Sequence, residues 1–100
     1  MKTTELDKLQ RMLEEANIPF KRMNHPFADG AMIGYPNLNL DVRVCSIIET
    51  EFSYGGKNDL LEIMGLLTDQ EAQRDSVVGY LNAENVFARI KKDFEKTEER

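Results

Sequence analysis

The N-terminal segment has apolar residues at the spacing of an amphipathic helix. They recur every three or four positions and so form one stripe on a helix surface: Leu6, Leu9, Met12, Leu13 and Ala16. Thr4 followed by Asp7 is a typical N-cap arrangement. Asn17 tolerates the left-handed conformation and Pro19 follows it closely. We therefore expect a first helix that begins after Thr4 and ends near Asn17.

Three segments in the next part of the chain have the composition of strands. They are residues 18–23 (IPFKRM), 31–35 (AMIGY) and 42–52 (VRVCSIIETEF). Asp29-Gly30 before the second segment and Pro36 after it are turn signals. Because the connections are short, the natural topology is an antiparallel meander.

The third of these segments, 42–52, is the strongest strand prediction because it is rich in β-branched residues. At period two, one face holds an apolar set: Val42, Val44, Ile48 and Phe52. The other face carries Cys45 and Ile47 and then becomes acidic at Glu49 and Glu51. This pattern predicts a strand whose first half is buried and whose second half reaches solvent.

The C-terminal half has the pattern of helices. A largely buried helix is expected to begin at Lys57 or Asn58 and to run to about residue 67, because its apolar surface is wide. Thr68 and Glu71 have the spacing of a capping box, which predicts a short helical turn there. Residues 76–81 fit a short fourth strand or an extended loop.

The last helix is expected to follow Asn82, which is a favourable N-cap residue. Its apolar stripe contains Ala83, Val86, Phe87, Ile90 and Phe94. The polar tail, about residues 95–100, is expected to fray. Residues 1–100 should therefore form a single α+β domain with an antiparallel sheet of three or four strands and helices packed on it.

Composition and charge narrow the classes of function. The longest apolar runs are far shorter than the ~20 residues that span a bilayer, and the N-terminal sequence MKTTELDKLQRML has no hydrophobic signal core. We therefore expect a cytoplasmic protein that does not contact a membrane. The net charge of −5 disfavours nucleic-acid binding, which depends on cationic neutralisation of phosphates. It fits solubility or a basic protein partner.

Catalytic and metal chemistry find little basis in the sequence. The single Cys45 lies in an apolar stretch and is predicted to be a buried thiol rather than half of a dyad with His25. One Cys and one His cannot complete a tetrahedral zinc site. The stretch NLNLD (37–41) lacks the glycine and glutamate of a calcium loop. We expect no enzymatic activity, no metal and no cofactor.

The stretch SYGGKNDLLEIMGLL (53–67) suggests a phosphate-binding corner, since two glycines and a lysine precede a predicted helix. It lacks the spacing of a P-loop, and Asn58 stands where Ser or Thr would bind magnesium. Asp59 and Glu62 would oppose an anion. The pattern favours a structural turn at Gly55, Gly56 and Lys57, with an anion site as the alternative.

A protein-binding surface is predicted at the rim of the sheet. Tyr35 ends the second expected strand and Tyr54 follows the third, so in a meander both fall near the Gly55-Gly56 turn. Tyrosines at a rim suit protein interfaces. Glu49 and Glu51 share one side of a strand, which is typical of a charge pair that protects a sheet edge. The candidate binding residues are Tyr35, Glu49, Glu51, Tyr54, Gly55, Gly56 and Lys57.

Two segments, SYGGKNDLLEIMGLL and DSVVGYLNAENVFARI, cover about a third of the chain. On these segments the chain resembles a group of small proteins encoded by phages and prophages of Gram-positive, often gut-dwelling, bacteria. The resemblance implies a genomic context and carries no activity or functional residue. It leads to the expectation of a small acidic binding module that acts on a host protein as an inhibitor or adaptor. The alternative is an oligomeric binder of a phosphorylated small molecule through the Gly55-Gly56-Lys57 turn.

Overall fold

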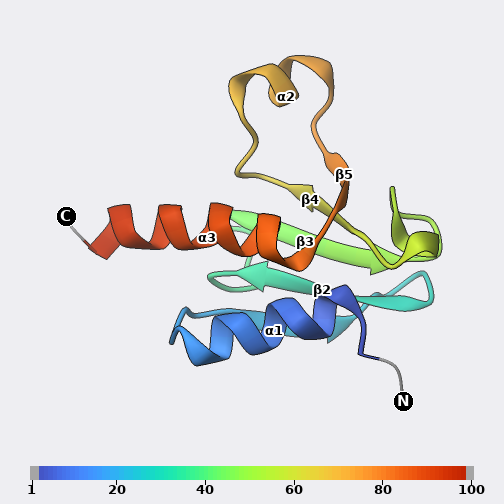
Figure 1. Ribbon diagram of the computed structural model, residues 1–100, viewed down its shortest axis with the longest axis horizontal. Helices are drawn as coiled ribbons and strands as arrows, with labels where there is room; N and C mark the ends of the chain where they lie inside the picture. The colour runs from blue at the N-terminus through green and yellow to red at the C-terminus, as the bar shows by residue number, and fades with distance from the viewer. Residues whose placement is uncertain (1–2, 99–100) are drawn as a thin grey trace.

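A computed structural model describes residues 3–98, which form two layers (Figure 1). One layer is an antiparallel sheet of five strands, which confirms the α+β class and adds to the three or four strands expected. Two long helices, α1 and α3, pack against each other on one face of the sheet. The strands are β1 (Lys21–Asn24), β2 (Gly30–Tyr35), β3 (Cys45–Thr50), β4 (Leu61–Met64) and β5 (Val78–Leu81).

The strands follow one another in space in the order β1-β2-β3-β4-β5. Each pairs antiparallel with the next, so the predicted meander is confirmed. Residues 78–81 form the edge strand β5, which decides between the two readings of 76–81. The central position in the sheet belongs to β3, whose neighbours are β2 on one side and β4 on the other.

Helix α1 (Glu5–Glu15) begins and ends where the sequence predicts. The Thr4 hydroxyl oxygen accepts a hydrogen bond from the Asp7 N–H at 3.1 Å, and the Thr4 N–H donates to the Asp7 carboxylate at 3.1 Å. This reciprocal pair satisfies backbone donors that a helix start leaves open. Asn17 adopts a left-handed φ of 56° just after the helix. The stripe at Leu6, Leu9 and Leu13 is fully buried.

Helix α3 (Ala83–Glu98) follows its predicted cap, because Asn82 Oδ1 accepts the Asn85 N–H at 2.8 Å. It buries Ala83, Val86 and Ile90 against the sheet and α1. The helix includes residues 95–98 of the tail that was expected to fray. Residues 99–100 lie outside the described part of the chain.

The helix predicted from Lys57 or Asn58 to residue 67 is wrong. Only the single turn η1 (Gly56–Asn58) is helical, and it ends at Asp59, whose φ of 55° is left-handed. The chain then enters β4, where Leu61 and Ile63 alternate into the core with exposed fractions of 0% and 1%. The wide apolar surface that suggested a helix instead serves a strand with one buried face. Pairing with β3 supplies backbone partners that periodicity alone does not reveal.

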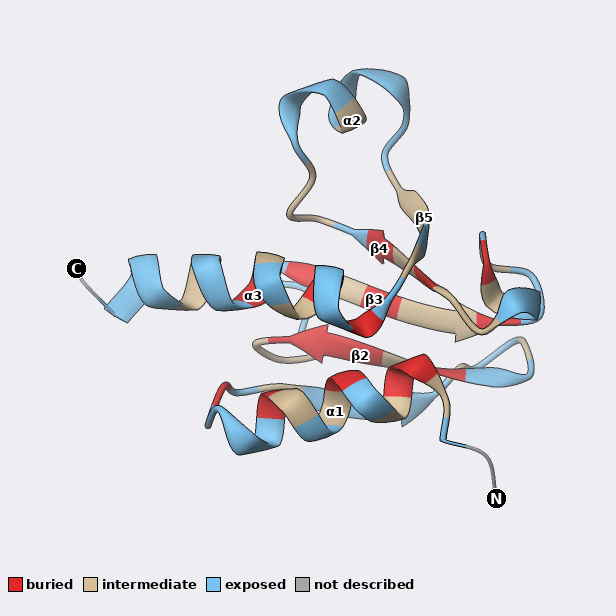
Figure 2. Ribbon diagram, in the orientation of Figure 1, coloured by how far each residue is buried: buried red, intermediate tan, exposed pale blue. Residues whose placement is uncertain are grey.

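The short helix α2 (Asp69–Arg74) starts at the predicted capping box of Thr68 and Glu71. Figure 1 shows it at the tip of a long connection that projects from the body between β4 and β5. None of its residues is buried. Figure 2 shows the buried residues concentrated where α1, α3 and the central strands meet, with α2 mostly exposed.

The buried face of β3 is the opposite of the one its apolar pattern favours. Cys45 and Ile47 point toward the helices and are 1% and 0% exposed. Val44 and Phe52, from the more apolar set, are 43% and 77% exposed and lie outside β3, which is shorter than the predicted strand 42–52. The reason is register, since Tyr35 pairs with Cys45 and Ile33 pairs with Ile47, which places these four side chains on one face.

Candidate functional site

Tyr35 does not lie at the rim where the sequence places it. It is 3% exposed, and its hydroxyl donates a hydrogen bond of 2.8 Å to the Asp93 carboxylate of α3. Burial, with Asp93 as a further cause, raises the pKa of the Tyr35 phenol well above its usual range. Tyr35 pairs with the first residue of β3, whereas Tyr54 follows the last. The two tyrosines therefore lie at opposite ends of the sheet, and Tyr35 serves the core.

Glu49 and Glu51 do not protect a sheet edge, because β3 is the central strand. Glu49 lies under the start of α1, where its Oε1 accepts the Leu6 N–H at 3.1 Å. Glu51 comes after the end of β3 and is exposed, with its backbone N–H donated to the Asp29 carbonyl at 3.3 Å. The expected pair is thus separated into one interior and one surface carboxylate.

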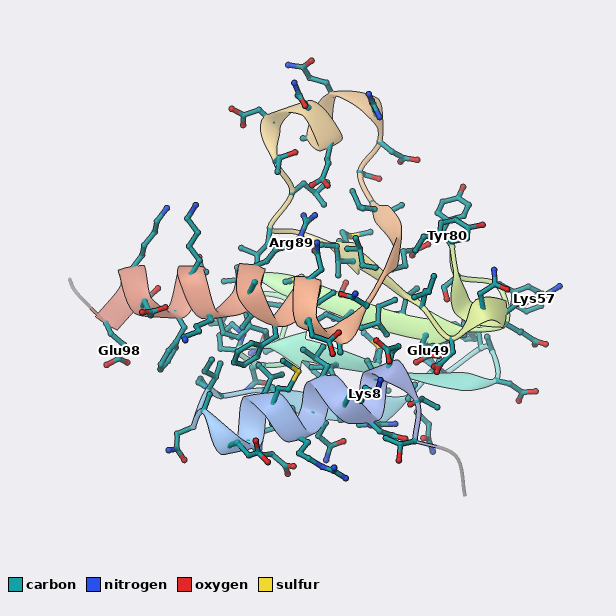
Figure 3. The ribbon with its side chains drawn as sticks, in the orientation of Figure 1. Lys8, Glu49, Lys57, Tyr80, Arg89 and Glu98 are labelled. Carbon is teal, nitrogen blue, oxygen red and sulfur yellow. The ribbon has the colours of Figure 1, made fainter. Side chains whose placement is uncertain are left out.

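The Glu49 carboxyl belongs to a cluster with Asp59 and Glu5. Asp59 Oδ1 accepts the Glu5 N–H at 2.9 Å, and Glu5 Oε1 accepts the Ala83 N–H at 2.9 Å. The cluster therefore caps the starts of both α1 and α3. Lys8 pairs with Glu5 at 2.9 Å, and Figure 3 shows Lys8 and Glu49 in this region. Within residues 3–98, no group of three or more His, Cys, Asp or Glu side chains is arranged to hold a metal.

Crowding of these acids changes the protonation of Glu49. Burial raises its pKa to about 8, assisted by a hydrogen bond with the Asp59 side chain and by the nearby charges of Asp59 and Glu5. The Leu6 N–H opposes the shift because it stabilises the charged form. The crowded carboxyls thus favour retention of a proton by the cluster at a higher pH than is usual for a carboxyl group. The place of Glu49 between a strand and a helix start makes it a structural group with a titration near physiological pH.

Backbone hydrogen bonds close the chain on itself at the Gly55-Gly56-Lys57 turn. The N–H groups of Gly56, Asn58, Asp59 and Leu60 all donate to carbonyls of residues 53–56, at 2.9–3.1 Å. A Cβ on Gly56 would lie 1.8 Å from the Thr50 carbonyl oxygen, so glycine is needed for the close approach of the two chain segments. Lys57 extends away from the body at the end of the β3–β4 connection (Figure 3). This geometry favours the structural turn.

Cys45 and His25 are not brought together. Cys45 is 1% exposed, and burial raises the pKa of its thiol to about 12, so the predicted buried thiol is confirmed. β1 ends at Asn24, and His25 follows it. Asn24 pairs with Ala31 near the start of β2, whereas Cys45 pairs with Tyr35 at the other end of β2.

The face of the sheet that α1 and α3 leave uncovered carries an apolar row. Met23 pairs with Met32, and Met32 pairs with Ile48, so these three side chains are neighbours across β1, β2 and β3. Arg22 and its partner Ile33 point the other way, since Arg22 contacts Asp7 of α1 at 2.8 Å. We call the uncovered side, with Met23, Met32, Ile48 and Met64, the open face.

A shallow hollow of about 220 Å³ lies at one end of the open face. Its lining includes Leu40, Val44, Ser46 and Met64. Met64 is 54% exposed and Leu40 is 77% exposed. The loop after β2 closes over Gly34, where a Cβ would lie 2.6 Å from the Asn37 carbonyl oxygen. The open face is thus part strand and part loop, with apolar side chains from both.

Exposed hydrophobic side chains are distributed unevenly over the molecule. Among residues 3–98, every large one lies in a strand or in a connection between strands, and none lies in α1 or α3. They are Met23, Phe27, Leu40, Val42, Val44, Phe52, Tyr54, Met64 and Tyr80. Exposed hydrophobic side chains mark an interaction site when they form a contiguous patch.

Four of the predicted site residues stay together: Tyr54, Gly55, Gly56 and Lys57. Tyr80 of β5 joins them, because its N–H donates to the Tyr54 carbonyl at 3.1 Å. Tyr54 is 54% and Tyr80 62% exposed. The sequence pattern did not single out Tyr80 or Met64. If residues 61–64 are assigned to a strand, the alternation of side chains places Met64 on the face that Leu61 and Ile63 do not occupy. That alternation is the signal by which the sequence could have identified Met64.

No family model, curated protein or solved structure matched this chain. In the part of the chain that is described, none of the helices has the length and apolar character needed to cross a membrane.

Proposed function

We propose that this protein is a small binding module that docks a protein partner against the open face of its sheet. The observation that carries the proposal is the apolar row of the open face, where Met23, Met32 and Ile48 are cross-strand neighbours and Met23 and Met64 are 40% and 54% exposed. The helix layer, by contrast, turns a polar surface to solvent. A face with this composition gains free energy when a partner removes it from water.

The chemistry of the open face suits an adaptable interface. Met23, Met32 and Met64 have flexible, polarisable side chains, which can repack against different partner shapes. Tyr54 and Tyr80, which are both exposed, would add aromatic anchors at the β5 side. The resemblance to phage and prophage proteins supports a bacterial host protein as the partner and the host cytoplasm as the place of action.

The alternative, an oligomeric binder of a phosphorylated small molecule, has less support. It would use the Gly55-Gly56-Lys57 turn, where four amides already donate within the turn. Lys57 would then be left as the main contact, and a single exposed lysine holds an anion weakly. The binding-module proposal is therefore preferred.

The test is a quantitative affinity capture from bacterial lysate with mass spectrometry. Three baits are compared: the wild-type protein, a Met23→Lys/Met64→Lys variant and a Phe27→Lys control. Phe27 serves as the control because it is 90% exposed but lies in the β1–β2 connection. We expect one protein at near-stoichiometric yield with wild type and control, reduced at least tenfold with the double variant. Equal capture by all three baits would contradict docking on the open face. Sedimentation analysis of the bait alone measures its oligomeric state. A dimer that the double variant abolishes would show that the open face binds a second copy of this chain.

A further inference from the structure

Helix α3 and the chain that leaves β4 enclose a groove of about 450 Å³. Its apolar lining comes from Leu66 and Leu67 on one side and Ala88 of α3 on the other. This groove lies on the α3 side of the molecule and shares no lining residue with the open face.

Cationic side chains follow the α3 wall of this groove. Arg89, Lys92 and Lys96 lie three and four residues apart and so share one helix face. Lys92 and Lys96 are exposed. On a protein with a net charge of −5, this strip is a local concentration of positive charge beside an apolar floor. Asp93 also lines the groove, where its carboxylate accepts the buried Tyr35 hydroxyl at 2.8 Å and offsets one of the three positive charges.

The first cation of the strip already binds a carboxylate. Arg89 donates to both oxygens of Glu71, at 2.7 and 2.9 Å, and to the Leu66 carbonyl at 3.1 Å. This fork lowers the pKa of the Glu71 carboxyl to about 2. Figure 3 shows Arg89 directed from α3 toward the α2 segment. The strip continues past this internal contact, so Lys92 and Lys96 extend along α3 beyond the carboxylate that α2 supplies.

We propose that the groove binds an acidic segment of a partner protein. An apolar side chain of the segment packs on Leu66, Leu67 and Ala88, and its carboxylates pair with Lys92 and Lys96. Charge complementarity selects this occupant, because the strip is positive where the molecule as a whole is acidic. A nucleic acid would meet only two cations that Glu71 does not hold, against a repulsive overall charge.

This site is independent of the open face. Together the two surfaces would let the protein bridge two partners, which favours an adaptor over a simple inhibitor. Either surface can fail in experiment without the other, because the substitutions that test them lie on separate elements.

The experiment is a selection of random dodecapeptides displayed on their encoding mRNA, with the full chain as bait. The enriched peptides are then measured by fluorescence anisotropy on wild type, on Lys92→Gln/Lys96→Gln and on Lys91→Gln. Lys91 is exposed on the same helix but does not line the groove, so it controls for the loss of a lysine charge outside the groove. Thermal unfolding of each variant confirms that the fold is retained.

We expect peptides with at least two acidic residues beside a large apolar residue. Their affinity should fall at least tenfold in the double variant and less than twofold in Lys91→Gln, and it should weaken with added salt. Failure to enrich such peptides, or equal binding to all three proteins, would overturn the proposal. So would tight binding of a fluorescein-labelled oligothymidylate that depends on Lys92 and Lys96, because the occupant would then be a nucleic acid.

Discussion

Glu49 Oε1 accepts a hydrogen bond of 3.1 Å from the backbone N–H of Leu6, which ties the centre of the sheet to the first turn of α1. The neighbouring Asp59 binds the Glu5 N–H, and Glu5 in turn binds the Ala83 N–H at the start of α3. Both helices therefore begin on side chains from a cluster of acids. The charge of that cluster couples the docking of the helices to pH.

The first prediction concerns this pH dependence. The pKa of Glu49 is raised to about 8 in the folded protein from an ordinary value of 4.5. The unfolded chain thus releases a proton that the folded chain retains, so this group's stabilisation is full below about pH 4.5 and is lost as pH rises toward 8. Glu49→Gln should flatten this part of the stability profile. At pH 8 we expect the variant to be about 1–2 kcal/mol more stable than wild type, after discounting for partial solvent access.

The measurement is urea unfolding at several pH values between 5 and 8. Glu51→Gln is the matched control, because Glu51 is exposed just beyond the same strand. Parallel profiles for wild type and Glu49→Gln would show that the Glu49 carboxyl is ionised throughout the range.

The second prediction concerns the α2 segment. Arg89 and Glu71 form a two-pronged ion pair, with N–O distances of 2.7 and 2.9 Å, between α3 and α2. Because α2 buries none of its own residues, Glu71→Gln should release the segment while the body stays folded. Amide hydrogen exchange in residues 66–75 should accelerate several-fold. Asp69→Asn, on the exposed first turn of α2, is the control, and equal exchange in both variants would refute the tethering role.

The same pair sets a response to acid. The pKa of Glu71 is lowered to about 2, first by its hydrogen bonds with Arg89. Its contribution is therefore present above the ordinary carboxyl pKa of 4.5 and is lost as pH falls toward 2. The protection factors of the α2 segment, which correct for the intrinsic pH dependence of exchange, should fall over this range in wild type and stay level in Glu71→Gln.

The third prediction concerns the buried phenol. Tyr35→Phe removes the 2.8 Å hydrogen bond to Asp93 while it keeps the ring in the core. We expect a loss of about 1–1.5 kcal/mol in the free energy of unfolding. Tyr80→Phe should change it by less than about 0.5 kcal/mol, because Tyr80 is 62% exposed. Equal effects in chemical denaturation would mean that the hydroxyl of Tyr35 contributes nothing specific.

The fourth prediction separates the structural turn from an anion site. Gly56→Ala would place a Cβ 1.8 Å from the Thr50 carbonyl oxygen, so the backbone must shift. We expect a loss of about 2–4 kcal/mol in the free energy of unfolding. Lys57→Ala should leave both this free energy and the melting temperature in phosphate buffer unchanged. A phosphate-dependent stabilisation that Lys57→Ala abolishes would restore the anion-site alternative.

Local signals in the sequence determined where the helices begin. Thr4 with Asp7, Thr68 with Glu71 and Asn82 each provide a cap that the structure contains, because capping joins residues only a few positions apart. Asn17 likewise takes the left-handed conformation that its type permits. The meander followed from short connections, which leave consecutive strands little choice but to pair.

Tertiary contacts determined what the local pattern left open. Residues 61–64 have a surface that fits a helix or a strand, and pairing with β3 selects the strand. β3 spans only Cys45–Thr50, so Val44 and Phe52 of the predicted apolar face lie outside it, whereas Cys45 and Ile47 pair with buried residues of β2. The same register placed Glu49 beneath α1 and Tyr35 in the core, which dispersed the predicted site.

The sequence by itself therefore determined the α+β class, the helix caps, the antiparallel order and the buried thiol of Cys45. Only the tertiary structure decided which face of the sheet the helices cover, and with it which residues remain available to a partner. The physical reason is the distance along the chain between the residues that interact. Caps and turns depend on neighbours along the chain, whereas the choice of buried face depends on register and on helices packed from far along the sequence.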